Sequence, residues 1–123
     1  MRYEVSVRVD DVAAAHHLEG YPGDCRRLHG HNWSFAASVG ADALHGDMVV
    51  DFRVLKDVFR ALDHTFLDED PEICADGHRP TTERVATVVA ARIQRVLDAL
   101  PNRPRLLRIA VRETSRNTVV FTP

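Results

Sequence analysis

The chain has 123 residues and a mass of 13.8 kDa, enough for one domain with one hydrophobic core. Apolar residues make up 45% of the sequence and charged residues 28%, a balance that is typical of globular proteins and argues against disorder. The formal charge of -2 gives no reason to expect a nucleic-acid partner, and no apolar run approaches the roughly 18 residues of a membrane helix, so we expect one domain over residues 1–123 without a membrane partner.

Two alternating runs in the first third of the chain predict half-buried strands. Apolar and polar side chains alternate over residues 3–9 and again over residues 32–39. The segment between these runs contains a loop at residues 19–24, as its Gly and Pro content indicates. Residues 48–50 are typical of the end of a strand that returns from a turn.

The middle of the chain predicts two helices. Asp51 is placed to cap a helix whose apolar residues recur at spacings of three and four over residues 52–62. Residues 80–83 are typical of a second helix start, and an apolar stripe follows over residues 85–100. Pro101 ends this second helix, since proline cannot continue it.

The last part of the chain predicts two more strands, over residues 107–112 and 118–122. The element order is then β-β-α-α-β-β, and strands at both ends with helices between them favour an α+β fold. We expect a four-stranded antiparallel sheet with both helices on one face. The other face and the two sheet edges would be poorly covered in a monomer, so we also expect a homo-oligomer.

Histidines are concentrated in one part of the sequence, since five of the seven lie within residues 16–45. His29 and His31 are two residues apart, so on a strand both rings point to the same face. His16 follows small residues at the end of the first strand and is the best third ligand, whereas His17 should face the other way. Three histidines with an open fourth position describe a catalytic zinc site, although an HxH pair also occurs by chance in turns.

Cys25 lies four residues before His29 in a polar loop, beside Arg26 and Arg27. Basic neighbours and a nearby zinc ion would lower the pKa of its thiol and favour the thiolate. Cys25 is therefore either a reactive base or a fourth zinc ligand, and the sequence leaves both roles open. Because the chain has only two cysteines, too few for a disulfide framework, we expect it to reside in the cytoplasm.

Asp63 and His64 follow the apolar stripe of the first helix. A carboxylate beside an imidazole orients the ring and raises its basicity, which suits proton transfer. The alternative is that His64 interacts with the dipole at the C-terminal end of the helix.

Glu113 is in phase with the apolar residues of its strand. A carboxylate on that face must be paired or must bind a ligand, because burying it alone is expensive. It could accept two hydrogen bonds from the N–C–N–H edge of a pterin or a guanine. The alternative is that the strand ends at Val111 and that Glu113 is solvated.

Several motifs follow one another in order along nearly the whole chain: Ala14-Ala15-His16-His17-Leu18, Cys25-Arg26-Arg27-Leu28-His29-Gly30-His31-Asn32-Trp33, Met48-Val49-Val50-Asp51-Phe52, Leu62-Asp63-His64-Thr65-Phe66-Leu67, Pro80-Thr81-Thr82-Glu83 and Arg112-Glu113-Thr114. Together they resemble the 6-pyruvoyltetrahydropterin synthase / 6-carboxytetrahydropterin synthase family. The resemblance implies the tunnelling fold, or T-fold, which assembles into oligomeric barrels as trimers or hexamers with active sites where subunits meet. It also implies a role for each candidate residue: zinc on His16, His29 and His31, a catalytic Cys25, a proton-transfer pair Asp63–His64, and pterin anchoring by Glu113.

Three residues separate Cys25 from His29, and this spacing resembles the 6-carboxytetrahydropterin synthase (QueD) type of queuosine and deazapurine biosynthesis. That resemblance implies a zinc-dependent carbon–carbon lyase with 7,8-dihydroneopterin triphosphate as its substrate. The runner-up is a 6-pyruvoyltetrahydropterin synthase, which keeps the carbon chain intact. A non-catalytic zinc- or pterin-binding module is the alternative of another class, against which the intact Cys25, Asp63 and His64 argue. One departure from the family pattern is Asp68, which stands where asparagine is usual.

Overall fold

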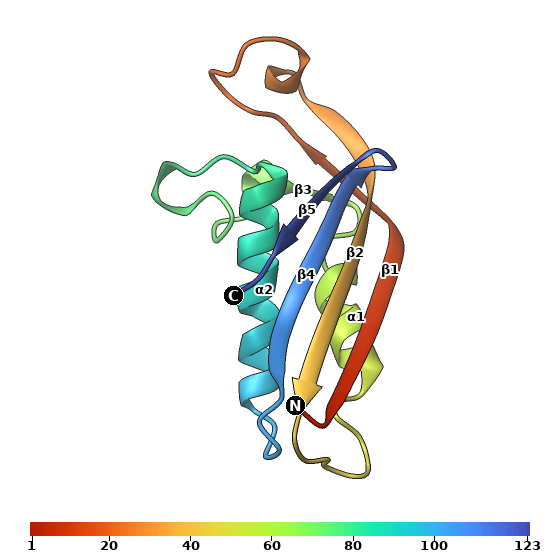
Figure 1. The fold of residues 1–123 in the computed structure, drawn as a ribbon. Coiled ribbons are helices and arrows are strands. Elements are labelled where there is room, and N and C mark those ends of the chain that lie inside the picture. The colour runs from red at the N-terminus through yellow and green to blue at the C-terminus, as the bar shows by residue number, and fades with distance from the viewer.

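A computed structural model describes residues 1–123, and four antiparallel strands form most of its sheet (Figure 1). Strand β1 (Tyr3–His16) pairs antiparallel with β2 (His29–Ala41), β2 with β4 (Arg105–Thr114), and β4 with β5 (Asn117–Phe121). The alternating residues predicted each of these strands, because one face of the sheet is buried and the other is not. The loop between β1 and β2 projects beyond the end of the sheet (Figure 1).

A short fifth strand that the sequence did not indicate joins the four predicted ones. Strand β3 (Thr65–Phe66) pairs parallel with β1, which makes the sheet mixed, with the order β3-β1-β2-β4-β5. The expected strand end at residues 48–50 is wrong, since this segment forms only an isolated bridge between His45 and Met48. Val49 and Val50 of this segment are buried in the core without pairing in the sheet, which accounts for its apolar character.

Both helices begin where the sequence predicts, and each follows a capping residue. Helix α1 (Phe52–Arg60) starts after Asp51, whose side chain accepts a hydrogen bond from the backbone N–H of Arg53. Helix α2 (Thr82–Asp98) starts after Thr81, which caps the N–H of Arg84 in the same way. Such caps satisfy backbone donors that have no partner within the helix. Three short 3-10 turns complete the secondary structure: η1 (Asp24–Arg26), η2 (Leu67–Glu69) and η3 (Ala75–Gly77).

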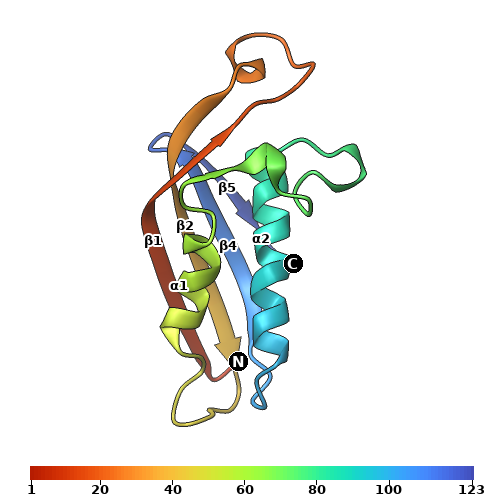
Figure 2. The ribbon, with the colours of Figure 1, turned by 180° about the vertical axis from the view of Figure 1, so that it is seen from behind.

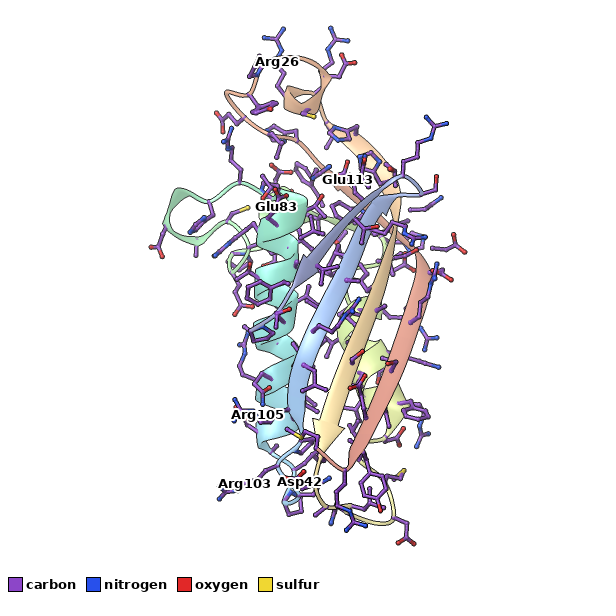
Figure 3. The ribbon with its side chains drawn as sticks, viewed as in Figure 1. Arg26, Asp42, Glu83, Arg103, Arg105 and Glu113 are labelled. Atoms are coloured by element: carbon purple, nitrogen blue, oxygen red, sulfur yellow. The ribbon has the colours of Figure 1, made fainter.

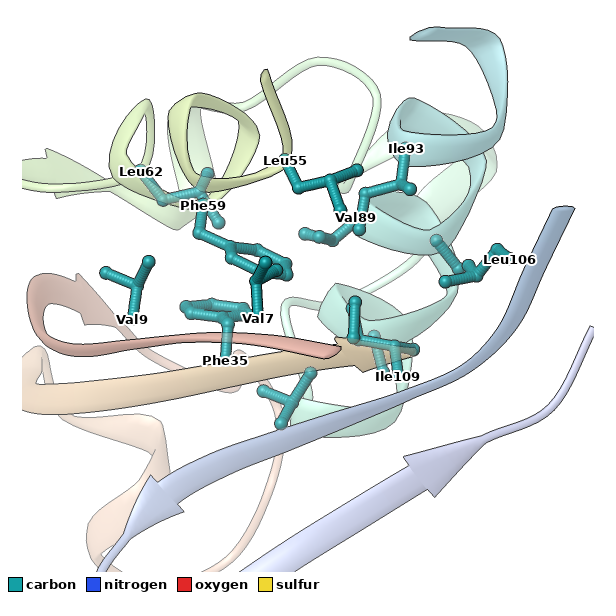
Figure 4. Close-up of a cluster of buried hydrophobic side chains, with 14 of the residues drawn as sticks. Val7, Val9, Phe35, Leu55, Phe59, Leu62, Val89, Ile93, Leu106 and Ile109 are labelled. Atoms are coloured by element: carbon teal, nitrogen blue, oxygen red, sulfur yellow. The ribbon is translucent and has the colours of Figure 1, made fainter. Parts of the chain in front are cut away.

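The two helices lie on the same face of the sheet, as the view from behind shows (Figure 2). Between them and the sheet lies one cluster of 26 buried hydrophobic residues, in which Phe35 of β2 stacks on Phe59 of α1 with ring centroids 5.2 Å apart (Figure 4). Burying a side chain of this size contributes about 1.5 to 3 kcal/mol to stability. The core thereby holds the sheet in place, and the histidines lie at the end of the sheet where β1 ends and β2 begins. No helix has the length and apolar character needed to span a membrane.

Candidate metal centre and active site

Three histidines meet where β1 ends and β2 begins. His16 is the register partner of His29, and His31 lies opposite Ala14, so the rings come from two adjacent strands. The ring centroids are 4.5 Å apart for His16 and His29, 4.8 Å for His29 and His31, and 5.3 Å for His16 and His31. The two-residue spacing on β2 and the pairing with β1 therefore bring the three imidazoles into one group.

Backbone carbonyls determine which ring nitrogens are free. The Nδ1 of His16 donates to the carbonyl of Pro80 at 2.8 Å, and the Nδ1 of His29 donates to the carbonyl of Arg27 at 2.6 Å. Because a carbonyl can only accept, each Nδ1 carries a proton, so that in the neutral ring the lone pair is on Nε2. This is the usual arrangement around metal-binding histidines, in which the second ring nitrogen is held by a hydrogen bond.

The free nitrogens are suited to a metal ion. The Nε2 atoms of His16 and His31 are both buried and make no hydrogen bond, although a carboxylate oxygen of Glu113 lies 3.1 Å from the Nε2 of His31. Burying unpaired polar atoms is costly, so such atoms in a folded protein call for an explanation such as a bound ion. Burial also lowers the pKa of His31, which favours the neutral imidazole that binds metals. The donor set therefore fits zinc.

Glu113 of β4, which Figure 3 labels, is the fourth member of this group. Its Oε1 lies 3.1 Å from the Nε2 of His31, its Oε2 lies 3.9 Å from the Nε2 of His16, and its Oε2 also accepts a hydrogen bond of 2.7 Å from the hydroxyl of Thr82. The ligand atoms of the three histidines and Glu113 all lie within 4.8 Å of one another. Strand β4 continues to Thr114, so the alternative of a strand that ends at Val111 is wrong.

Cys25 lies apart from this group in its own turn, η1, within the projecting loop between β1 and β2. Its thiol is free and exposed, and its sulfur is not among the ligand atoms that converge. The backbone carbonyl of Cys25 accepts a hydrogen bond of 2.6 Å from the N–H of Leu18. Figure 3 labels the next residue, Arg26, at the top of this loop, with Glu113 below it.

Asp63 and His64 form a pair beside β1. The Nδ1 of His64 lies 3.1 Å from the Oδ2 of Asp63, and 84% of the His64 side chain is exposed. His64 has a φ of 60°, which turns the chain into β3. Helix α1 ends at Arg60, so the helix dipole does not account for this histidine. His64 and His31 both line a cavity of about 390 Å³ at this end of the sheet.

Some contacts of the site could not be read from the histidine pattern. The indole of Trp33, which is fully buried, approaches His16 and His31 with centroid distances of 5.2 and 6.0 Å. Thr82 and Pro80 support Glu113 and His16, and both belong to the Pro80–Glu83 motif that marks the start of α2. The Pro80–Glu83 motif was therefore the only feature of the sequence that pointed to these residues, and it indicated the start of a helix but not a contact with the site.

Comparison with known proteins identifies the family. The model of the 6-pyruvoyl tetrahydropterin synthase family matches residues 4–123. The chain belongs to this family. It is 34% identical over 117 residues to the 6-carboxy-5,6,7,8-tetrahydropterin synthase of Bacillus subtilis, covering 91% of this chain and 80% of that protein. It is 35% identical over 91 residues to the protein of the same name from Synechocystis, covering 66% and 67% of the two chains.

A solved structure supports the same assignment. The 6-pyruvoyl tetrahydropterin synthase of Caenorhabditis elegans superposes with a TM-score of 0.73 at 26% identity, over 98% of this chain and 96% of that one. The α+β class and the predicted T-fold of the single chain are thereby confirmed. Membership of this family of pterin synthases makes the chain an enzyme of the pterin-synthase type.

Proposed function

We propose that this protein is a zinc-dependent 6-carboxy-5,6,7,8-tetrahydropterin synthase of queuosine or deazapurine biosynthesis. It would convert 7,8-dihydroneopterin triphosphate and one water molecule into 6-carboxytetrahydropterin, acetaldehyde and triphosphate. Three residues separate Cys25 from His29, and the curated relatives carry the name of this activity. The observation that carries the proposal is the convergence of three histidines, two of them with buried Nε2 atoms that make no hydrogen bond.

The metal part of the proposal rests on His16, His29 and His31. Zinc held by these three residues would act as a Lewis acid that polarises substrate oxygens and lowers the pKa of substrate hydroxyls. The carbonyls of Pro80 and Arg27 hold two of the rings in the orientation that binding requires. Three neutral histidines leave a position free for the substrate, as in other catalytic zinc sites.

Cys25 and His64 would move the protons of the reaction. As a thiolate, Cys25 would remove a carbon-bound proton. His64, oriented by the carboxylate of Asp63, would return a proton to the substrate. A thiol base requires a reducing compartment, which is why the proposal includes a cytoplasmic location.

Glu113 would anchor the pterin. A carboxylate can accept two hydrogen bonds from the N–C–N–H edge of the ring, and charge-assisted bonds of this kind are stronger than neutral ones. The hydroxyl of Thr82 holds one oxygen of Glu113, which orients the carboxylate before a ligand binds. Because Glu113 also lies beside His31, this role has to be separated from metal binding by experiment.

The active form would be a homo-oligomer, a trimer or hexamer whose sheets form a barrel. β3 pairs with β1 only at Ala14 and Ala15, so the remaining outer edge of β1 has no strand partner. The outer edge of β5 has none either, and both helices lie on one face of the sheet. Uncovered edges of this kind favour strand pairing between copies.

Product analysis tests the proposal. The purified protein, loaded with zinc, is incubated with 7,8-dihydroneopterin triphosphate, and the products are identified by mass spectrometry. Acetaldehyde together with 6-carboxytetrahydropterin supports the proposal. Triphosphate release without acetaldehyde would indicate the runner-up, a 6-pyruvoyltetrahydropterin synthase, which the name of the Caenorhabditis elegans structure favours. Binding of the pterin without any product would indicate a non-catalytic module.

A further inference from the structure

Asp68 contacts His17 through both of its carboxylate oxygens. Its Oδ1 accepts a hydrogen bond of 2.9 Å from the backbone N–H of His17, and its Oδ2 lies 3.0 Å from the Nδ1 of the same residue. The His17 ring also stacks on Phe66, with centroids 6.0 Å apart and planes inclined by 24°. Both partners are partly buried, since 31% of the His17 side chain and 16% of the Asp68 side chain are exposed. One carboxylate, that of Asp68, therefore holds both the backbone and the ring of His17.

His17 occupies the position at which the chain leaves β1 for the loop that carries Cys25. The preceding residue, His16, is the last of β1 and belongs to the histidine group. The following residue, Leu18, donates its backbone N–H to the carbonyl of Cys25. Asp68 is therefore linked to Cys25 through two successive residues, His17 and Leu18, and neither of them is a candidate metal ligand.

A second contact holds the same loop. The guanidinium of Arg79 lies 5.7 Å from the ring centroid of Tyr21 and donates to the backbone carbonyl of Glu19 at 3.5 Å. Arg79 and Asp68 both belong to the segment between β3 and α2. The segment between β3 and α2 thus contacts the loop twice, first at His17 through Asp68 and again at Glu19 and Tyr21 through Arg79.

We propose that Asp68 is a positioning residue that holds the Cys25 loop, through His17, at a fixed place relative to the histidines. The role of Cys25 as a base rests on the proposed function. The part of the inference that concerns the position of the loop does not. His16 does not depend on Asp68, because the carbonyl of Pro80 fixes its ring separately. His29 is bonded to the carbonyl of Arg27 at the far end of the loop, but it belongs to β2, as does His31. Loss of Asp68 should therefore displace the loop around Leu18 and Cys25, while the strands keep the three histidines and the metal in place.

The test compares Asp68→Ala and Asp68→Asn with Glu69→Ala, a neighbouring exposed acid in the same turn for which no polar contact is found. Asn keeps an acceptor for the backbone N–H of His17, whereas Ala keeps none. We expect Asp68→Ala to lower kcat by about 10- to 100-fold, the effect of a misplaced reacting group, with KM and zinc content close to those of the wild type. Asp68→Asn should recover most of this loss, and Glu69→Ala should behave as the wild type.

Trypsin supplies a readout that does not depend on activity, because Arg26 and Arg27 lie exposed in the loop. In Asp68→Ala, cleavage after these two residues should become at least several-fold faster, while cleavage after the exposed Arg53 on α1 stays unchanged. Unchanged loop cleavage and kcat in Asp68→Ala would overturn the inference, as would loss of zinc in Asp68→Asn. If the wild-type protein showed no turnover, the proposed function would fail, and the cleavage and zinc measurements would still decide the role of Asp68.

Discussion

The backbone N–H of Ala13 donates a hydrogen bond of 2.8 Å to the Oδ1 of Asp63. The carbonyl of Ala13 in turn accepts a bond of 2.6 Å from the backbone N–H of His64. Ala13 lies on β1 three residues before His16, so the same strand carries a metal-binding candidate and fixes the proton-transfer pair. The bond from Ala13 is the largest cause that lowers the pKa of Asp63, which keeps this carboxylate charged at neutral pH.

This charge leads to a prediction for Asp63→Asn. The amide can still accept from Ala13 but no longer stabilises a protonated His64, so turnover should fall by about 10²-fold or more. Steady-state kinetics with 7,8-dihydroneopterin triphosphate measure the loss, and zinc content should stay the same. Asp57→Asn, on the exposed side of α1, is the matched control. Normal turnover in Asp63→Asn would remove the pair from the mechanism.

The metal prediction concerns His29. The wild-type protein should contain about one zinc ion per chain, the stoichiometry of a single site. His29→Ala should lose metal and activity together, whereas His45→Ala, outside the histidine group, should keep both. Elemental analysis of the purified variants measures this. Full zinc occupancy in His29→Ala would show that the ligand assignment is wrong.

Glu113→Gln separates pterin anchoring from metal binding. If Glu113 anchors the ring, zinc should stay, and pterin affinity should drop at least about tenfold, because a charge-assisted hydrogen bond contributes about 1.5 to 3 kcal/mol. If Glu113 is instead a metal ligand beside His31, zinc affinity should drop. We expect the first result, since three histidines already form a catalytic site. Calorimetric titration with a pterin and with zinc distinguishes the two outcomes.

Cys25→Ala separates a base from a fourth ligand. As a base, Cys25 is needed only for proton transfer, so the variant should keep zinc and bind substrate while turnover falls by roughly 10² to 10⁴. Cys74→Ala is the control, because burial raises the pKa of that thiol and makes it a poor base. A Zn–S distance near 2.3 Å in X-ray absorption of the resting enzyme, with zinc loss in Cys25→Ala, would contradict the base role.

Stability should fall in acid, in part through Asp70. Burial raises the pKa of this carboxyl, but hydrogen bonds from Arg92 and from the backbone of Ile73 and Glu72 outweigh that effect and leave the pKa below its ordinary value. A carboxylate with a lowered pKa stabilises the fold above the pKa of the unfolded chain, and this contribution is lost as the pH falls through the folded value. Asp70→Asn should therefore cost about 1.5 to 3 kcal/mol at neutral pH. In urea unfolding at matched protein concentration, its difference from the wild type should shrink below about pH 4.

The sequence was most informative where one element determines the geometry. His29 and His31 share a strand, so their spacing alone places both rings on one face. The caps at Asp51 and Thr81 are local as well, because each side chain bonds a backbone N–H two or three residues ahead. Features of this kind need no knowledge of the rest of the fold.

Contacts between distant segments could not be predicted in this way. Strand β3 has two residues, too few to show an alternation, and it pairs with β1 where Asp63 and His64 are bonded to Ala13. The carbonyl of Pro80, which orients His16, is a backbone group that any residue type could supply. The place of Glu113 beside His31 likewise depends on how β4 aligns with β2.

Trp33 gives this protein a built-in optical reporter. It is the single tryptophan of the chain, its indole N–H donates to the carbonyl of Ala14, and its ring lies nearly perpendicular to the rings of His16 and His31. Fluorescence excited selectively at tryptophan therefore originates in direct contact with the candidate ligands. A metal that enters the site changes the charge beside the indole, and a paramagnetic ion such as Co²⁺ would quench its emission. Site occupancy can thus be followed in the unmodified protein, without substrate and without a label.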